Sequence, residues 1–86
     1  MSQVPTLGEI DYGLKSLKDA IGMIEARQKM NEIEKAEQVR QGNYANAAVH
    51  TGIGVGLMGA ENMVRLEIEA LEHRRLAVEA YLKGGS

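Results

Sequence analysis

Two histidines are the residues of this chain best suited to bind a metal ion or to move protons. His50 and His73 lie 23 positions apart, and the chain contains no cysteine. Two ligands four residues apart on a helix can face the same metal ion. Glu69 and His73 have that spacing, but an acid and a histidine without a third ligand are typical of a surface ion pair. His50 has no histidine or acidic residue four positions away. Because no serine, histidine and acid form a recognisable nucleophilic set either, we predict no metal site, no cofactor and no enzymatic activity.

A glycine-rich run, Gly52-x-Gly-x-Gly-x-x-Gly59, has the composition of a phosphate-binding loop. Loops of the P-loop type follow a strand and end in Lys-Ser or Lys-Thr. Here the last glycine is followed by Ala60, and no strand is predicted before it. We therefore do not predict a P-loop.

Positive charge for a small anion could come from three arginines instead. Arg74 and Arg75 follow His73, and Arg65 lies on the same predicted helix. A guanidinium group binds phosphate and carboxylate well because its donors form a planar fork. Binding of a small anionic ligand or a nucleotide by an oligomer, through these arginines and the glycine-rich stretch, is therefore an alternative function.

Composition excludes several other classes of protein. The 12 acidic and 10 basic residues are mixed along the chain and give a net charge of −2, so we expect no nucleic-acid partner. The absence of cysteine excludes a disulfide scaffold. No basic segment followed by an apolar run is visible at the N-terminus, and we expect a cytoplasmic protein.

The first half of the chain predicts one long helix. Thr6 and Glu9 form a capping box, in which the threonine hydroxyl accepts from the amide of Glu9 and the Glu9 carboxylate reaches back to the amide of Thr6. Apolar residues then recur at alternating spacings of three and four. They are Leu7, Ile10, Leu14, Leu17, Ile21 and Ile24. The next positions are Gln28 and Asn31, so we expect this apolar seam to stop and the helix to run on, thinly covered, to about residue 41.

The second half predicts another long helix, at about 44–83, after a turn at 42–43. Gly42 suits the position just after a helix, and Asn43 suits a helix N-cap. Apolar residues repeat every seven positions at Leu57, Val64, Leu71 and Val78. Glu61 and Arg75, which fall between them, are polar, so this seam is imperfect.

The stretch 43–60 carries no formal charge and contains four glycines. In a helix, Ala48, Gly52, Gly56 and Ala60 would share one face and allow another helix to approach closely. We call these four residues the small-residue strip. The partner of the strip would be the first helix or the same strip on another copy. Residues 52–59 are also the weak point of the helix, because each glycine costs about 1 kcal/mol relative to alanine, and a glycine-rich turn there is the competing interpretation.

Together these patterns predict an all-α fold, an antiparallel helical hairpin forming one domain over residues 1–86. One hairpin leaves much of either seam uncovered, so we expect a homo-oligomer, either a four-helix bundle or a larger helical assembly. The main functional hypothesis is a non-enzymatic module that binds a protein partner as an adaptor, chaperone or inhibitor. A third and weaker hypothesis, after binding of a small anion, is a membrane-active glycine zipper. We expect no membrane-spanning helix, because polar residues and glycines lower the hydropathy of the uncharged stretch.

Overall fold

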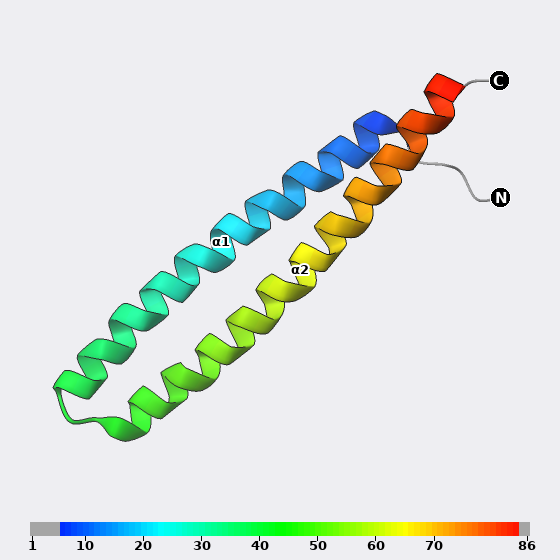
Figure 1. Cartoon of the computed structure of the whole chain (residues 1–86). Helices are drawn as coiled ribbons and strands as arrows, with labels where there is room; N and C mark the ends of the chain where they lie inside the picture. The colour runs from blue at the N-terminus through cyan, green and yellow to red at the C-terminus, as the bar shows by residue number, and fades with distance from the viewer. Residues whose placement is uncertain (1–5, 85–86) are drawn as a thin grey trace.

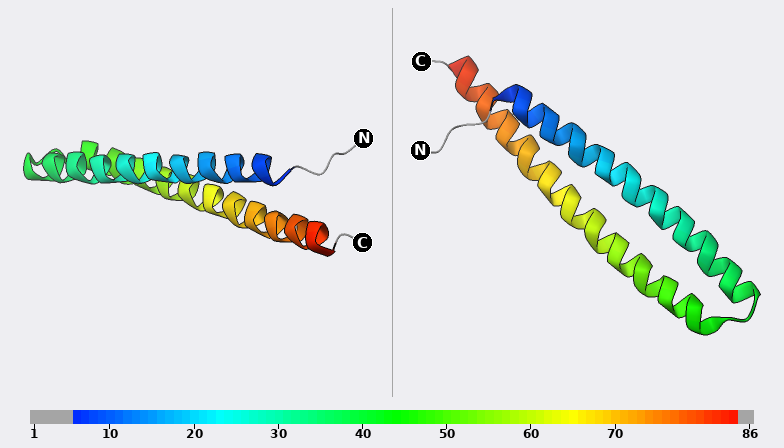
Figure 2. Two further views of the ribbon diagram at one scale, coloured as in Figure 1. Left: turned by 90° about the horizontal axis from the view of Figure 1, so that it is seen from above. Right: turned by 180° about the vertical axis from the view of Figure 1, so that it is seen from behind.

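The computed structural model describes residues 6–84, and within them the chain is an antiparallel hairpin of two helices without any strand. Helix α1 spans Leu7–Arg40 and helix α2 spans Tyr44–Gly84. The helices lie side by side along their whole length and cross at a shallow angle (Figures 1 and 2). They form a rod of 67 × 19 × 18 Å. The predicted all-α hairpin is therefore confirmed, and each predicted helix end differs by at most one residue. Residues 1–5 and 85–86 of the predicted domain lie outside the described residues.

Local hydrogen bonds fix where α1 begins. Thr6 is the N-cap in extended conformation, and its hydroxyl accepts a 3.1 Å hydrogen bond from the amide of Glu9. The same hydroxyl donates to the Glu9 carboxylate at 3.1 Å. The second bond of the predicted capping box thus runs between the two side chains, not from the carboxylate to the Thr6 amide. Either form holds a negative charge near the positive end of the helix dipole.

The turn between the helices is a Schellman motif, which requires a glycine. Gly42 has φ +76, a backbone conformation that side chains with a Cβ rarely adopt. Its amide donates to the carbonyl of Val39 at 3.0 Å, and the amide of Asn43 donates to the carbonyl of Gln38 at 2.8 Å. These two bonds satisfy carbonyls that the end of α1 would otherwise leave unpaired. The Asn43 side chain then accepts from the amide of Asn46 at 3.3 Å and starts α2.

Helix α2 continues without a break through all four glycines of the uncharged stretch. The competing glycine-rich turn at 52–59 is therefore excluded. The small-residue strip is nevertheless not packed on α1: Ala48, Gly52, Gly56 and Ala60 are all exposed. A Cβ added at Gly52 or Gly56 would meet nothing within 4 Å. The prediction that the small-residue strip packs on the first helix is thus wrong.

The hydrophobic core is concentrated at the end of the rod that carries the termini. Ile10, Leu14 and Val78 are buried together, and Leu7, Ile68 and Leu71 pack against them. Ile10 is only 2% exposed. Towards the turn, the buried residues are Ile21, Asn31 and Ala47. The two halves of the hairpin are therefore held together by different kinds of contact.

Candidate interaction surfaces

The contact between α1 and α2 follows one uninterrupted seam with the three-and-four spacing of an antiparallel coiled coil. Every residue of this seam is buried or half-buried. On α1 the seam is Leu7, Ile10, Leu14, Leu17, Ile21, Ile24, Gln28, Asn31, Lys35 and Gln38. On α2 it is Ala47, His50, Gly54, Leu57, Glu61, Val64, Ile68, Leu71, Arg75 and Val78. The apolar part of the α1 seam ends at Ile24, as predicted, but the contact between the helices continues through polar side chains, because α2 offers polar partners opposite them.

Asn31 and His50 form the centre of this polar section. Asn31 is 5% exposed, and its side-chain amide donates to the carbonyl of His50 at 2.8 Å. Its side-chain oxygen lies 2.9 Å from Nδ1 of His50, so Nδ1 is the nitrogen that carries a proton here. The Glu34 carboxylate lies 3.7 Å from the same nitrogen. Both polar groups of the buried Asn31 side chain are thus satisfied by one residue of the opposite helix.

Gly54 provides the space for Asn31. A Cβ at position 54 would lie 3.3 Å from Nδ2 of Asn31, closer than ordinary van der Waals contact. The close-packing glycines predicted from the sequence were Gly52 and Gly56, two residues away on either side, and not Gly54. The missed signal was the seam spacing itself, because counting back from Leu57 by three and four places Gly54, His50 and Ala47 on the inner face.

Two ion-pair clusters flank the seam and use two of the three arginines proposed for anion binding. Arg65 binds Glu61, with Nη2 and Oε2 2.7 Å apart, and Gln28 donates to the same carboxylate at 3.1 Å. The hydrogen bond from Arg65, and to a smaller extent the one from Gln28, lowers the pKa of Glu61. The Glu61 carboxylate in turn raises the pKa of Arg65.

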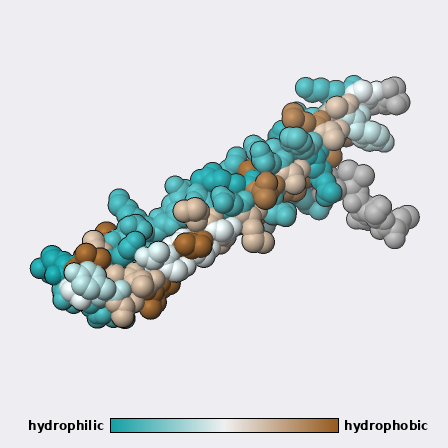
Figure 3. All heavy atoms as spheres, turned by 60° about the horizontal axis from the view of Figure 1, so that its bottom comes forward, coloured by the Kyte–Doolittle hydropathy of each residue, from teal (hydrophilic) through white to brown (hydrophobic). Residues whose placement is uncertain are grey.

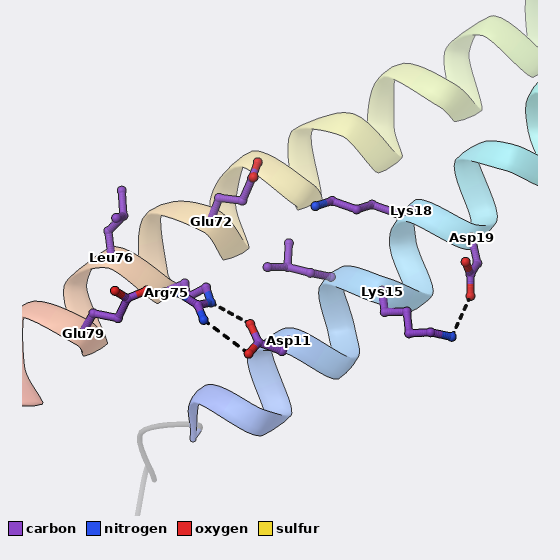
Figure 4. Close-up of a pocket in the computed structure, with 9 residues that line it drawn as sticks. Asp11, Lys15, Lys18, Asp19, Glu72, Arg75, Leu76 and Glu79 are labelled. Atoms are coloured by element: carbon purple, nitrogen blue, oxygen red, sulfur yellow. Dashed lines mark hydrogen bonds and ion pairs between the residues drawn. The ribbon is translucent and has the colours of Figure 1, made fainter.

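Arg75 joins the two helices near the open end of the hairpin (Figure 4). Its Nε donates to Oδ1 of Asp11 at 2.6 Å, and its Nη1 donates to Glu79. The bond to Asp11 raises the pKa of Arg75 and lowers that of Asp11. Arg74 is exposed and directly precedes Arg75 on the helix, so it points in a different direction. The three arginines therefore do not converge on one point.

The groove around Arg75 is wide, open and lined by charges of both signs (Figure 4). It has a volume of about 560 Å³, and Lys15 in it pairs with Asp19 at 3.4 Å. Such a mixture does not select a ligand of one charge. Within residues 6–84, no three histidine or acidic side chains gather in a way that could hold a metal ion.

The two long sides of the hairpin differ in chemistry. One side, which we call the charged flank, borders the grooves that contain Arg75 and Gln28. Its charged residues are Asp11, Lys15, Lys18, Glu25, Lys29 and Glu32 of α1 with Arg65, Glu69, Glu72 and Glu79 of α2, and the uncharged Thr51, Val55, Met58 and Leu76 line the same grooves. The opposite side, which we call the apolar flank, borders a small pocket between Met30 and Ile53. It comprises Gly13, Ser16, Ala20, Met23, Arg27, Met30 and Glu34 of α1 with Val49, Ile53, Gly56, Ala60 and Met63 of α2.

Large hydrophobic side chains on the apolar flank are open to solvent in the isolated chain. Met23 is 72% exposed and Met63 is 71% exposed. Val49, Met30 and Ile53 are also exposed. Figure 3 shows pale and brown residues gathered along the turn-proximal half of the rod, where the uncharged part of α2 lies. Two members of the small-residue strip, Gly56 and Ala60, lie on this flank; Ala48 and Gly52 lie further round α2.

No protein family model, curated protein or solved structure matches this chain. Among the described helices, neither has a segment of the length and hydropathy needed to span a membrane.

Proposed function

We propose that this chain is a non-enzymatic helical interaction module, an adaptor, chaperone or inhibitor, that works as a homo-oligomer. The observation that carries the proposal is the imbalance between core and surface. Within residues 6–84, five hydrophobic residues are buried, whereas fifteen large hydrophobic side chains are exposed. Exposed apolar area of this extent on a small protein marks contact surfaces. A chain of this length also has a marginal core by itself.

The surfaces favour binding of other helices over binding of small molecules. The outer faces of both helices are long, convex and continuous, and the groove around Arg75 is open and lined by charges of both signs. Arg65 and Arg75, two of the three arginines proposed for anion binding, already bind carboxylates of the same chain. Contact with protein is therefore the function for which these residues are best arranged.

Thermal unfolding followed by circular dichroism at several protein concentrations tests the proposal. When folding is coupled to association, the melting temperature rises with protein concentration. We expect such a rise, together with a mass above that of the monomer in analytical ultracentrifugation. A monomer whose melting temperature does not depend on concentration would contradict the proposal. A rise in melting temperature on adding ATP or inorganic phosphate would favour the anion-binding alternative instead.

A further inference from the structure

We propose that the apolar flank is the docking surface for a second copy of this chain, which completes an antiparallel four-helix bundle. The two-fold axis lies in the interface, perpendicular to the rod, so that α2 packs against the partner's α2 with Gly56 at the crossing point. The proposal rests on the proposed function and adds which face of the hairpin forms the interface, in which register the helices pair, and that the partner is a second copy.

The exposed area of the chain leaves room for such an interface. The protein exposes 6572 Å², whereas a compact monomer of 9.4 kDa exposes about 5,000 Å². Leaving the seven residues outside 6–84 out of both figures, with their full area at about 1.45 Å² per dalton deducted from the exposed area and the compact reference lowered to about 4,700 Å², still leaves an excess of roughly 800 Å². A stable interface of standard size covers about 800 Å² on each partner. The excess therefore matches what one further copy would cover.

The apolar flank is the side that a second copy can cover without burying many unpaired charges. In its turn-proximal part, from Met23 to Glu34 on α1 and from Val49 to Met63 on α2, only Arg27 and Glu34 are charged, whereas nearer the termini the same face of α2 continues with Glu67 and Arg74. The charged flank carries charged residues along its whole length, between exposed apolar residues such as Val55, Met58 and Leu76, and covering it would require desolvation of each charge. The apolar flank is also continuous with the seam of the hairpin, because Met30 and Ile53 line a pocket together with the seam residue Leu57. A second hairpin on this side would extend the existing core.

The order of residues on α2 fits a two-fold axis at Gly56. Val49 and Met63 each lie seven residues from Gly56, and Ile53 and Ala60 lie three and four residues from it. In an antiparallel pair crossing at Gly56, the large Ile53 faces the partner's small Ala60, and Val49 faces the partner's Met63. Alternation of large and small residues across facing positions is what close helix packing needs. Gly56 itself has open space above it, with nothing within 4 Å of an added Cβ.

The charges on α1 fit the same axis independently. Arg27 makes no hydrogen bond or ion pair with any residue among 6–84, although it lies on a half-apolar surface. Arg27 and Glu34 are seven residues apart. If α1 packs antiparallel to the partner's α1 with the two-fold axis near Met30, Arg27 lies beside the partner's Glu34, and the axis repeats this ion pair once more. Within one hairpin, Asn31 packs beside Gly54. The centre found on α1 and the centre found on α2 therefore lie at nearly the same level of the rod.

Single-cysteine cross-linking tests this register directly, because the chain has no cysteine of its own. Gly56→Cys should form a disulfide-linked dimer about tenfold faster than Gly52→Cys or Val55→Cys, since a disulfide requires Cα atoms within about 7 Å. Gly52 and Val55 are exposed neighbours on the same helix that point away from the apolar flank. Faster cross-linking at either control position would overturn the proposed face.

Matched glycine substitutions separate this proposal from the proposed function. Gly56→Leu should shift a dimer to monomer in sedimentation experiments, whereas Gly22→Leu and Gly52→Leu should leave it intact. All three glycines have no atom within 4 Å of an added Cβ, so the three sites are matched in the isolated hairpin. If the wild-type chain is a dimer and Gly56→Leu leaves it unchanged, the interface is elsewhere and the proposed function stands. If the wild-type chain is a monomer, both proposals fail.

Discussion

At the scale of single residues, the polar section of the seam depends on the fit between Asn31, His50 and Gly54. A buried side-chain amide is tolerated only when its donor and acceptor are both paired, and His50 pairs both of them. A buried asparagine in a helix pair lowers stability but fixes the register, because a shifted register would leave it unpaired. Asn31 thus sets how far α1 and α2 are offset along the rod.

Gly54→Ala should lower stability relative to Gly52→Ala, although both replace a helical glycine of α2 by alanine. Alanine gains up to about 1 kcal/mol in helix propensity at an unobstructed position. Gly52 is such a position, whereas the new Cβ at 54 would lie 3.3 Å from the hydrogen-bonded Asn31 side chain, which cannot yield without losing its partners. Urea unfolding at one protein concentration measures both variants. Equal stabilisation by the two alanines would show that the Asn31 contact is loose.

Acid should destabilise the hairpin through the paired carboxylates. Arg75 lowers the pKa of Asp11, and Arg65 together with Gln28 lowers that of Glu61. A group whose pKa is lower in the folded state stabilises the fold above its unfolded pKa, which is about 4 for these side chains. That contribution is lost as the pH falls from about 4 through the lower folded value. We expect the melting temperature to decrease when the pH is lowered below about 4.

Asp11→Asn is the variant that checks this pH dependence. It should melt at a lower temperature than the wild type at pH 7. Its melting temperature should also decrease less on acidification, because the ion pair with Arg75 is already absent. Glu32→Gln is the control, since Glu32 is exposed and makes no ion pair with a residue among 6–84. An identical pH profile for Asp11→Asn and the wild type would show that the Asp11–Arg75 pair contributes nothing to stability.

At the scale of the elements, the seam between the two helices has an apolar half near the termini and a polar half near the turn. The apolar half of the seam buries Ile10, Leu14 and Val78, whereas the polar half joins the helices by hydrogen bonds such as Gln28 to Glu61. Burial of apolar area stabilises more than a solvent-accessible hydrogen bond does. The terminal half should therefore hold the hairpin together, and the turn half should depend more on a partner.

Ile10→Ala should destabilise the fold by about 2–5 kcal/mol, the range found for removing a large aliphatic side chain from a core. Ile33→Ala is the matched control, because Ile33 lies on the same helix and is 58% exposed. Its loss should cost much less. Chemical denaturation of both variants at equal protein concentration gives the comparison. Similar losses for the two would mean that the Ile10 cluster is not the core of the hairpin.

At the scale of the whole molecule, the rod has more apolar surface than one hairpin can bury. Two helices in contact cover only one stripe of each other, and every other face remains open. The charged flank suits water, while the apolar flank and the uncharged part of α2 do not. Two-fold pairing through the apolar flank would bury Met23, Met30 and Met63 and leave Leu66, Leu76 and the rest of the small-residue strip for a different protein. Self-association and partner binding can therefore use separate faces of one molecule.

The sequence by itself determined the two helices, their turn and the direction of the chain. The capping residues Thr6 and Asn43, the glycine after α1 and the three-and-four spacing act locally, so they can be recognised without knowing what packs on the helix. The spacing also placed the apolar half of the seam correctly from Leu7 to Ile24. It did not reveal that the seam continues, since Gln28 and Asn31 count as inner residues only when the polar groups opposite them are known.

Only the tertiary structure decided which glycines of α2 face α1. Each residue turns about 100° around a helix, so Gly54 points away from Gly52 and Gly56 by about 200° and lies on the opposite face. A run of glycines at every second position supports either orientation equally well. The choice was made by seam residues up to 24 positions further along α2, from Leu57 to Val78, whose burial against α1 fixes the rotation of the whole rigid helix. That rotation sends Gly54 inward to Asn31 and leaves Gly56 outward, free to meet another chain.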